Sequence, residues 1–283
     1  MTGLFLVDKP AGPSSFGVLR QLRPALGRKL GHAGTLDPFA SGLLLVLAGR
    51  ATRLARYLSG LDKTYRAVVQ FGATSSTLDP DGELQETGGS TDADAVAAAA
   101  EALTGRVLQR VPAASAVHVD GERAYARMRR GEEVDVPPRE VHVTELSLVA
   151  FDRGGQRGTF DVACSKGTYV RQIAADLGEA TGAGAYCLEL RRLTIGPFSV
   201  DNAARPADID GREGAGWFRE PVDALPHLPL RELSEQEGER VCNGRTVGRD
   251  GELGPTRLVR DGALLAVASP AGDVLRPEVV LCP

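Results

Sequence analysis

Residues 31–42 read GHAGTLDPFASG, and the apolar run LLLVL follows directly at 43–47. The glycines let the chain bend and let its backbone approach a ligand closely. Pro38 fixes its own φ and disfavours the helical conformation at Asp37. The pattern therefore places one carboxylate on a loop beside a buried strand, where a rigid scaffold can present a catalytic group. Taken alone, the stretch favours a plainer interpretation, in which Asp37 opens an Asx turn or caps a helix.

The composition of the 283 residues is that of a globular protein, with 42% hydrophobic and 25% charged side chains. The length is compatible with two domains. No apolar run approaches the roughly 20 residues that span a bilayer. Residues 1–10 lack the basic segment and the long apolar run of a signal peptide. We therefore expect a cytoplasmic protein without a membrane partner.

The cysteines and histidines are too scattered to indicate a metal site. No Cys-x-x-Cys pair occurs, and the four histidines show no zinc-ligand spacing. The sequence also contains no Walker loop, dinucleotide fingerprint or serine nucleophile elbow. We expect no metal, no cofactor and reduced, mostly buried thiols. The thiols are Cys164, Cys187, Cys242 and Cys282.

Charge is distributed unevenly along a chain whose formal net charge is −4. Residues 1–60 contain eight Lys and Arg against two acidic residues, whereas residues 67–105 contain seven acidic residues and no Lys or Arg. The first segment suits contact with phosphates, and the second does not. Ordinary solvated faces are the commoner cause of such a bias, so the pattern alone leaves both interpretations open.

The hydrophobic pattern predicts a series of strands and helices. In the stretch 64–71 the alternation places every second residue, beginning with Tyr65, on one buried face. A helix capped by Ser14 or Ser15 is expected to bury Phe16, Leu19 and Leu22 and to break or restart at Pro24. Strands are also expected at 4–8, 43–47, 141–151, 158–164 and 186–195, and helices at 51–58, 92–103 (capped by Thr91 and stopped by Gly105) and 169–177.

Three further segments differ in composition from the rest. Residues 106–140 are irregular, and within them the basic stretch 121–131 is expected to be helical. Such a protrusion could grip RNA or could be an exposed helix with solvated arginines. Residues 203–228 are rich in Pro, Gly and Asp and are expected to form a linker. A small β-rich module with one helix at about 234–241 follows, and it is too small to be an independent enzyme.

Arg171 falls in the first turn of the helix predicted at 169–177, where the helix dipole disfavours a cation. A cation there needs a partner, and a buried carboxylate would serve. A single carboxylate that works without metal or cofactor also needs a nearby cation to stay ionised away from water. The residues therefore make Arg171 a candidate partner of Asp37.

Five motifs stand in the order of one family and cover about residues 3–200. They are DKP with SS (8–10 and 14–15), GHAGTLDPFASGLL (31–44), KTYRA (63–67), CSKGTYVR (164–171) and LRRL (190–193). Together they resemble the bacterial tRNA pseudouridine-55 synthase family, the TruB type. One stretch departs from the family: where its members have paired prolines and a lysine, residues 111–118 read VPAASAVH.

The resemblance implies a reaction and a set of site residues. The protein would isomerise uridine 55 in the T loop of tRNA to pseudouridine after flipping the base out of the loop. Asp37 would be the catalytic acid and would attack either the sugar C1′ or the base C6. Tyr65 would stack on the base and take part in the final proton transfer, and Arg171 would pair with Asp37. The implied substrate contacts are Lys9, His32, Gly34, Lys166, Leu190 and Arg191.

The resemblance also implies the architecture and the partners. We expect an α+β fold in which residues 1–228 form a catalytic domain on a mixed or antiparallel sheet. This domain would include an RNA-gripping arm at about 106–140 and the linker at about 203–228. Residues 229–283 would form a PUA-like RNA-binding module. The expected partner is the T-arm stem-loop of tRNA, bound by a monomer without a guide RNA.

Two other functions remain open from the residues. The first is that of a guide-RNA-dependent relative, which would need partner proteins; such relatives usually have a longer basic C-terminus than the VVLCP that ends this chain. The second is that of a non-catalytic RNA-binding or tRNA-folding protein.

Overall fold

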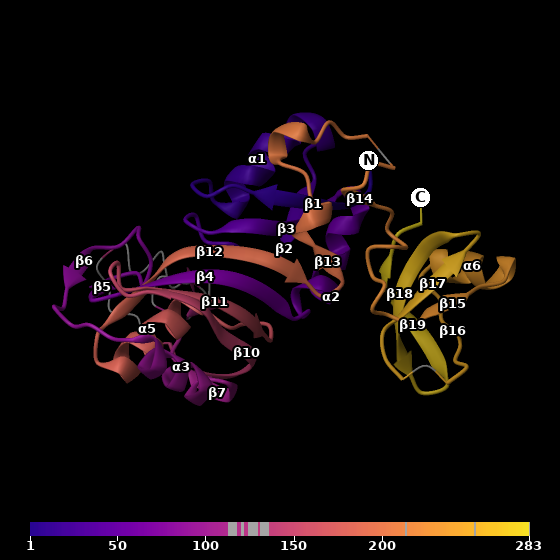
Figure 1. The fold of residues 1–283 in the computed structure, drawn as a ribbon. Helices are drawn as coiled ribbons and strands as arrows, with labels where there is room; N and C mark the ends of the chain where they lie inside the picture. The colour runs from indigo at the N-terminus through magenta and orange to yellow at the C-terminus, as the bar shows by residue number, and fades with distance from the viewer. Residues whose placement is uncertain are drawn as a thin grey trace. The chain divides into compact units, whose positions relative to one another are not determined.

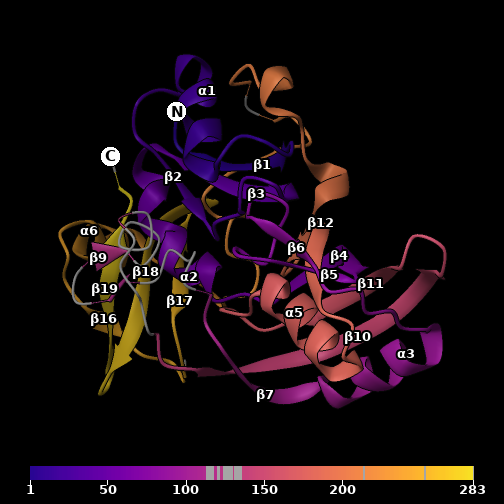
Figure 2. The same ribbon diagram turned by 90° about the vertical axis from the view of Figure 1, so that its left-hand side faces the viewer.

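A computed structural model describes residues 1–112, 118–119, 122–123, 130, 136–212, 214–251 and 253–282 (Figures 1 and 2). The chain forms two compact units. Unit 1 comprises Met1–Leu36, Leu43–Gly60 and Pro197–Pro283, and unit 2 comprises Asp37–Gly42 and Leu61–Gly196. The segment that contains Asp37 therefore belongs to unit 2, although unit 1 precedes and follows it in the sequence.

Unit 2 is built on a sheet of five long strands in the order β12-β4-β11-β10-β7, with antiparallel neighbours. The first two residues of β3 (Ser41–Ala48) pair with β12 in parallel, so the sheet is mixed. Helices α5 and α3 pack against the same face, α5 beside β12 and α3 beside β10 (Figures 1 and 2). The bounds are β4 Lys63–Phe71, β7 Gly105–Gln109, β10 Arg139–Asp152, β11 Arg157–Cys164, β12 Ala185–Ile195, α3 Ala93–Ala102 and α5 Val170–Thr181.

The burial of β4 follows the alternation read from the sequence. Tyr65, Ala67, Val69 and Phe71 are buried, while Arg66 between them is exposed. Two short strand pairs complete unit 2: β5 (Ala73–Ser75) with β6 (Leu84–Glu86), and β8 (His118–Val119) with β9 (Glu122–Arg123).

Unit 1 contains the N-terminal strands and helices. Helix α1 (Ser15–Leu26) packs beside β2, which pairs with β3 in antiparallel register, and β14 pairs with β1. The core of this region includes Phe5, Leu19, Leu22 and Phe218. The remaining bounds are β1 Gly3–Lys9, β2 Leu30–Ala33, η1 Gly49–Leu54, α2 Ala55–Ser59, β13 Phe198–Ser199, η2 Val200–Asn202, η3 Pro206–Asp208 and β14 Phe218–Arg219.

Unit 1 also includes a C-terminal five-stranded sheet, drawn in yellow in Figure 1, with the order β15-β17-β18-β19-β16. Helix α6 (Glu235–Cys242) begins with a capping box between Ser234 and Glu237. The sheet and α6 share a hydrophobic core of their own that includes Val241 and Leu258. The strands are β15 Leu230–Glu232, β16 Val247–Gly248, β17 Thr256–Arg260, β18 Ala263–Ala271 and β19 Val274–Val280.

The structure corrects the predicted N-terminal helix in two places. Phe16 is 56% exposed, because the buried line of α1 runs through Val18, Leu19, Leu22 and Leu26, and Phe16 lies about 100° away from it at 3.6 residues per turn. The helix also continues through Pro24, three residues before its C-cap, Gly27. Proline removes one backbone donor so close to the end that the rest of the helix is preserved.

Other helices differ from the prediction at their ends. Asp92, not Thr91, caps α3, because its carboxylate accepts the amide of Ala95 at 2.9 Å; the helix ends at Ala102. The segment predicted as a helix over 51–58 begins as the 3₁₀ turn η1 and becomes α-helical only at α2. Helix α5 continues to Thr181, because the first residue that stops it is Gly182 with φ 70°.

Two further predictions concern the basic helix at 121–131, most of which lies outside the described residues, and the linker at 203–228. Glu122 and Arg123, expected within a helix, form β9. The rest of the basic stretch 121–131, except residue 130, and most of the expected arm lie outside the described residues. The expected linker 203–228 has little regular structure, but its strand β14 pairs with β1 and its Phe218 is buried, so it packs into unit 1.

The prediction of four reduced thiols is wrong for two cysteines. Cys242 and Cys282 form a disulfide, with a Cα–Cα distance of 5.6 Å. They are 40 positions apart, and only the folding of the last strand beside the end of α6 brings them together. Cys164 and Cys187 are free and buried, as predicted.

No helix in the described part of the chain is long and apolar enough to cross a membrane.

Candidate active site

Asp37 forms an ion pair with Arg171, and both belong to unit 2. The Nε atom of Arg171 lies 2.9 Å from Oδ2 of Asp37. The guanidinium side chain is 3% exposed, whereas the carboxylate side chain is 33% exposed. The carboxylate is therefore reachable by a substrate while its compensating cation is held inside the protein.

The loop that carries Asp37 is fixed at both sides of the carboxylate. The carbonyl of Asp37 accepts the amide of Ala40 at 3.2 Å, which closes a turn around Pro38. Gly42, with φ 102°, pairs with Arg192 of β12. A Cβ at Gly42 would lie 2.2 Å from the carbonyl oxygen of Arg192, so only glycine fits at this close approach.

A second carboxylate, Asp79, holds Arg171 from the other side. The Nη1 nitrogen of Arg171 donates to Oδ2 of Asp79 at 3.0 Å and to the carbonyl of Thr77 at 2.7 Å. The side chain of Asp79 is 7% exposed. Two carboxylates thus offset the unfavourable position of a cation in the first turn of α5.

The start of α5 is fixed by a side chain from β7. Tyr169 is the N-cap residue and makes no side-chain cap. Instead, the buried amide of Gln109 accepts the backbone N–H of Tyr169 at 2.8 Å and donates to its carbonyl at 3.0 Å. These two bonds set the position of the turn from which Arg171 extends.

Asp79 is a residue that sequence reasoning missed, because its stretch LDPDG indicates an ordinary turn. The turn is present, and Oδ1 of Asp79 accepts from Oγ1 of Thr77 at 2.5 Å and from the amide of Asp81 at 3.1 Å. Leu78 has φ 65°, an uncommon conformation for leucine, and its carbonyl accepts the amide of Cys187 at 3.0 Å. The one sequence feature that could have indicated Asp79 is the proline that follows it, as Pro38 follows Asp37.

Tyr65 and Arg192 form a second buried pair near Asp37. They stand opposite each other on β4 and β12, they are 6% and 1% exposed, and their side chains are hydrogen-bonded. Burial raises the pKa of Tyr65, and the Cys164 and Asp37 charges act in the same direction, while Arg192 opposes them. Tyr65 is therefore a neutral phenol at neutral pH. Sequence reasoning did not single out Arg192, because an arginine near a strand end carries no sign of burial.

Lys63 adds a third buried basic group at the start of β4. Burial, together with the positive charges of Arg192 and Lys166, lowers its pKa to about 8. The Lys63 ammonium donates to the carbonyl of Leu61. The neighbourhood of Tyr65 is thus rich in positive charge, which suits an anionic substrate.

The predicted RNA contacts divide between the two units. In unit 2, Leu190 is 7% exposed on β12, Arg191 is half-buried beside it, and Lys166 is exposed before α5. In unit 1, Lys9 is fully buried and its Nζ donates to the carbonyl of Pro10 at 2.8 Å. His32 is half-buried on β2, and Gly34 follows β2 with φ 83°. Of the predicted catalytic residues, Arg171 pairs with Asp37, and the charge of Asp37 acts on Tyr65.

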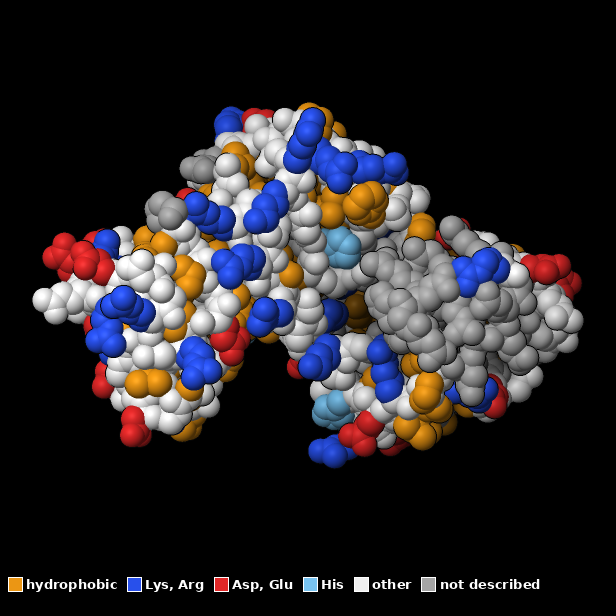
Figure 3. All heavy atoms as spheres, turned by 180° about the vertical axis from the view of Figure 1, so that it is seen from behind, with side chains coloured by type: hydrophobic (Ala, Val, Ile, Leu, Met, Phe, Trp, Pro, Cys, Tyr) orange, Lys and Arg blue, Asp and Glu red, His pale blue; other side chains and the backbone are white. Residues whose placement is uncertain are grey.

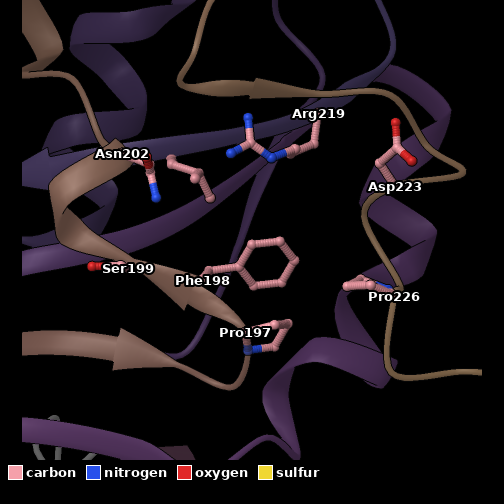
Figure 4. A pocket seen from close by; sticks show the side chains of 8 residues that line it. Pro197, Phe198, Ser199, Asn202, Arg219, Asp223 and Pro226 are labelled. Atoms are coloured by element: carbon pink, nitrogen blue, oxygen red, sulfur yellow. The ribbon is translucent and has the colours of Figure 1, made fainter.

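A pocket of about 420 Å³ lies elsewhere, within unit 1 (Figure 4). It is lined by Leu6, Pro197, Phe198, Ser199, Asn202, Arg219, Asp223 and Pro226. None of these residues belongs to the Asp37 cluster, so this pocket is not the candidate active site. Among the described residues, no group of three or more His, Cys, Asp or Glu could hold a metal ion.

Comparison with known proteins identifies the class of enzyme. The family model of the TruB family pseudouridylate synthase N-terminal domain matches residues 23–170. The chain therefore belongs to the TruB family and is a pseudouridylate synthase, as its motifs predicted.

Curated relatives match over the full length. The chain is 41% identical to the tRNA pseudouridine synthase B of Thermobifida fusca (strain YX), covering 98% of both chains. It is 38% identical to that of Paenarthrobacter aurescens (strain TC1), covering 100% of this chain and 96% of the relative.

Solved structures share the fold at low sequence identity. A Cbf5-Nop10-Gar1 complex matches with a TM-score of 0.77 and 24% identity, over 99% of this chain and 85% of that chain. An H/ACA RNP bound to a substrate RNA containing 2′-deoxyuridine matches with a TM-score of 0.76 and 22% identity, over the same shares of the two chains. These likenesses confirm the predicted α+β pseudouridine synthase fold.

Proposed function

We propose that this enzyme isomerises uridine 55 in the T loop of tRNA to pseudouridine, with Asp37 as its catalytic aspartate and without a guide RNA. The observation that carries the proposal is the Asp37–Arg171 pair, in which an accessible carboxylate lies 2.9 Å from a buried guanidinium. The full-length likeness to bacterial tRNA pseudouridine synthases B supports tRNA as the substrate.

The reaction balances within the uridine itself. The bond between C1′ and N1 breaks, a bond between C1′ and C5 forms, C5 loses a proton and N1 gains one. A carboxylate can begin this exchange by attacking either C1′ or C6. Arg171 supplies positive charge beside the Asp37 carboxylate in place of water, so the carboxylate can remain ionised when RNA covers the site. Asp79 acts as a positioning residue, because it holds Arg171 and does not face the substrate.

Tyr65 contributes as a neutral phenol. Because its pKa is raised, Tyr65 stays protonated at neutral pH, and we assign it to stacking on the flipped base and to a part in the proton transfer that finishes the isomerisation. Arg192 donates to the Tyr65 oxygen, which leaves the phenolic O–H able to point toward the base. Leu190 would pack against the flipped uracil. A base in a loop is cheaper to extrude than one in a duplex, which favours a stem-loop substrate.

The remaining contacts belong to the same proposal. Lys166 and Arg191 in unit 2 and Lys9, His32 and Gly34 in unit 1 would contact the RNA around the target. We assign residues 1–228 to catalysis, with the arm at about 106–140 gripping the RNA. We assign residues 229–283 to RNA binding as a PUA-like module. The enzyme would act as a monomer.

The test is to map pseudouridine, by mass spectrometry or chemical labelling, in a T-arm stem-loop treated with purified protein. Wild type is expected to form pseudouridine, and Asp37→Asn is expected to form none while its Kd for RNA changes little. Asp161→Asn is the matched control, because Asp161 is an exposed carboxylate of unit 2 paired with Arg66. Turnover by Asp37→Asn would contradict the proposed role.

The same experiment separates the rival functions. If wild type modifies the stem-loop only when a guide RNA is added, the stand-alone mode is wrong. If wild type binds and folds tRNA but forms no pseudouridine, the protein is an RNA-binding protein and not an isomerase.

A further inference from the structure

Helix α1 presents an exposed aromatic ring beside two arginines. Phe16, Arg20 and Arg23 stand at i, i+4 and i+7, which places them on one line along the helix. Phe16 is 56% exposed, and the Cζ atoms of Arg20 and Arg23 lie 5.9 and 5.7 Å from the centroid of its ring. We call these three side chains the Phe16 face. Distances of this size allow cation–π attraction to hold both guanidinium groups against the ring.

The arginines of the Phe16 face have no acidic partner among the described residues. Helix α1 contains no acidic residue, and neither Arg20 nor Arg23 takes part in an ion pair there. Two other exposed arginines of unit 1 are neutralised locally: Arg205 lies 2.7 Å from Asp208, and Arg212 lies 2.7 Å from Asp210. Figure 3 shows Lys and Arg side chains gathered in the upper part of the view, where Figure 1 draws α1. The Phe16 face thus keeps its positive charge for an anionic partner.

The helix that carries the Phe16 face is attached to the catalytic loop. The buried hydroxyl of Ser15 donates to the carbonyl of Leu36 at 3.0 Å and accepts its amide at 2.9 Å. Leu36 directly precedes Asp37 in the chain. From Arg20 to Arg23 the helix rises about 4.5 Å, which is close to the axial spacing of about 3.4 Å between neighbouring phosphates of one duplex strand.

We propose that the Phe16 face binds the phosphate backbone of the RNA stem that adjoins the target uridine. This inference rests on the proposed function. Arg20 and Arg23 contact phosphates, and Phe16 holds their guanidinium groups in place before the RNA arrives. Restricting the flexible side chains of Arg20 and Arg23 before RNA binds lowers the entropy that they lose on binding. This is the role that we assign to the exposed ring of Phe16.

The test measures the Kd of an isolated T-arm stem-loop at several salt concentrations for wild type, the Arg20→Ala/Arg23→Ala double variant, Phe16→Leu and Phe16→Trp. Two lost phosphate contacts are expected to weaken binding about tenfold near 0.1 M salt and to reduce the slope of log K against log salt by about two. Phe16→Leu is expected to weaken binding severalfold, whereas Phe16→Trp, which keeps an aromatic face, restores wild-type affinity. Arg205→Ala and Arg212→Ala are the matched controls and should leave the slope unchanged.

Three outcomes would overturn the inference. They are an unchanged slope in the double variant, a loss seen only with full-length tRNA and not with the stem-loop, and a Phe16→Leu variant that binds like wild type. All three residues are exposed, so these variants should fold; thermal unfolding checks this, and Arg→Gln versions replace any variant that unfolds early. Binding does not require turnover. Failure of Asp37→Asn to abolish isomerisation would therefore contradict the proposed function without affecting this result.

Discussion

Replacing Asp79 by Asn tests whether the second carboxylate positions the first through Arg171. Asp79 is 7% exposed and accepts from Arg171 at 3.0 Å, on the side of the guanidinium away from Asp37. Asparagine has almost the same shape, and its single oxygen can keep accepting from Thr77 and Asp81 in the turn, so its amide nitrogen replaces the oxygen that accepts from Arg171. What is removed is one of the two negative charges beside a buried cation.

The magnitude follows from the partners that remain. Breaking a buried ion pair completely costs about 3–5 kcal/mol, but Arg171 retains Asp37 and the carbonyl of Thr77. The loss in free energy of unfolding is therefore expected near 2 kcal/mol, within the range for a charge-assisted hydrogen bond. If about 1.4–2 kcal/mol of that loss also appears in the transition state, isomerisation slows by about 10–30-fold.

The assay is single-turnover pseudouridine formation at saturating stem-loop RNA, together with urea unfolding of the same preparations. Asp161→Asn is again the control, because its pair with Arg66 is exposed and should affect neither quantity. A rate within twofold of wild type in an Asp79→Asn protein that has lost stability would refute the positioning role. In that case Asp79 would only neutralise Arg171.

Three further changes test other parts of the molecule. Tyr65→Phe keeps the ring but removes the oxygen to which Arg192 donates; we expect a loss of about 1–3 kcal/mol in the free energy of unfolding and slower isomerisation, measured by urea unfolding and single-turnover kinetics. Opening the Cys242–Cys282 bond by reduction or by Cys242→Ser should lower stability by up to about 4 kcal/mol, the chain-entropy value for a separation of 40, measured as a lower urea midpoint. The pKa of Lys63 is lowered from 10.5 to about 8. Between these pH values the unfolded chain binds more protons than the folded one, so stability should rise with pH there, and Lys63→Met should remove that rise.

A specific result would contradict each of these three predictions. A Tyr65→Phe enzyme with wild-type rate would exclude a role for the phenolic proton. An unchanged urea midpoint under reductant would show that the disulfide adds nothing to stability. A Lys63→Met protein whose stability still rises between pH 8 and 10.5 as in wild type would assign that rise to other groups.

Local patterns were sufficient to predict four of the five strands of the unit 2 sheet, but not β7, which lies at the start of the stretch 106–140 that was expected to be irregular. The alternation in β4 identifies a strand with one buried face, and the structure buries Tyr65 on that face. The association of Arg171 with a carboxylate was also predictable, because a cation in the first turn of a helix conflicts with the helix dipole. Its partner, Asp37, sat in an Asp-Pro turn that many proteins use without catalysis.

Contacts between distant segments could not be predicted. Asp79 and Arg171 are separated by 92 positions, and neither local pattern refers to the other. Arg192 is buried only because β12 lies beside β4, and Cys242 meets Cys282 only because the last strand returns to α6. The error at Phe16 has a different origin. The helix was predicted correctly, but its buried face was assigned to the wrong side, because a large apolar residue such as Phe16 is usually buried.

The discontinuity of unit 2 determines when the candidate active site can assemble during synthesis. Asp37 leaves the ribosome early, but Asp79, Arg171 and Arg192 follow in that order over nearly all of the rest of unit 2. At about 5–20 residues per second, the ribosome needs about 8–31 seconds to pass from Asp37 to Arg192. During that time the early carboxylate has no buried cation, and strand β3 has no β12 beside its first residues. The newly made chain can therefore complete its candidate active site only late, when β12 pairs with β4 and with Gly42.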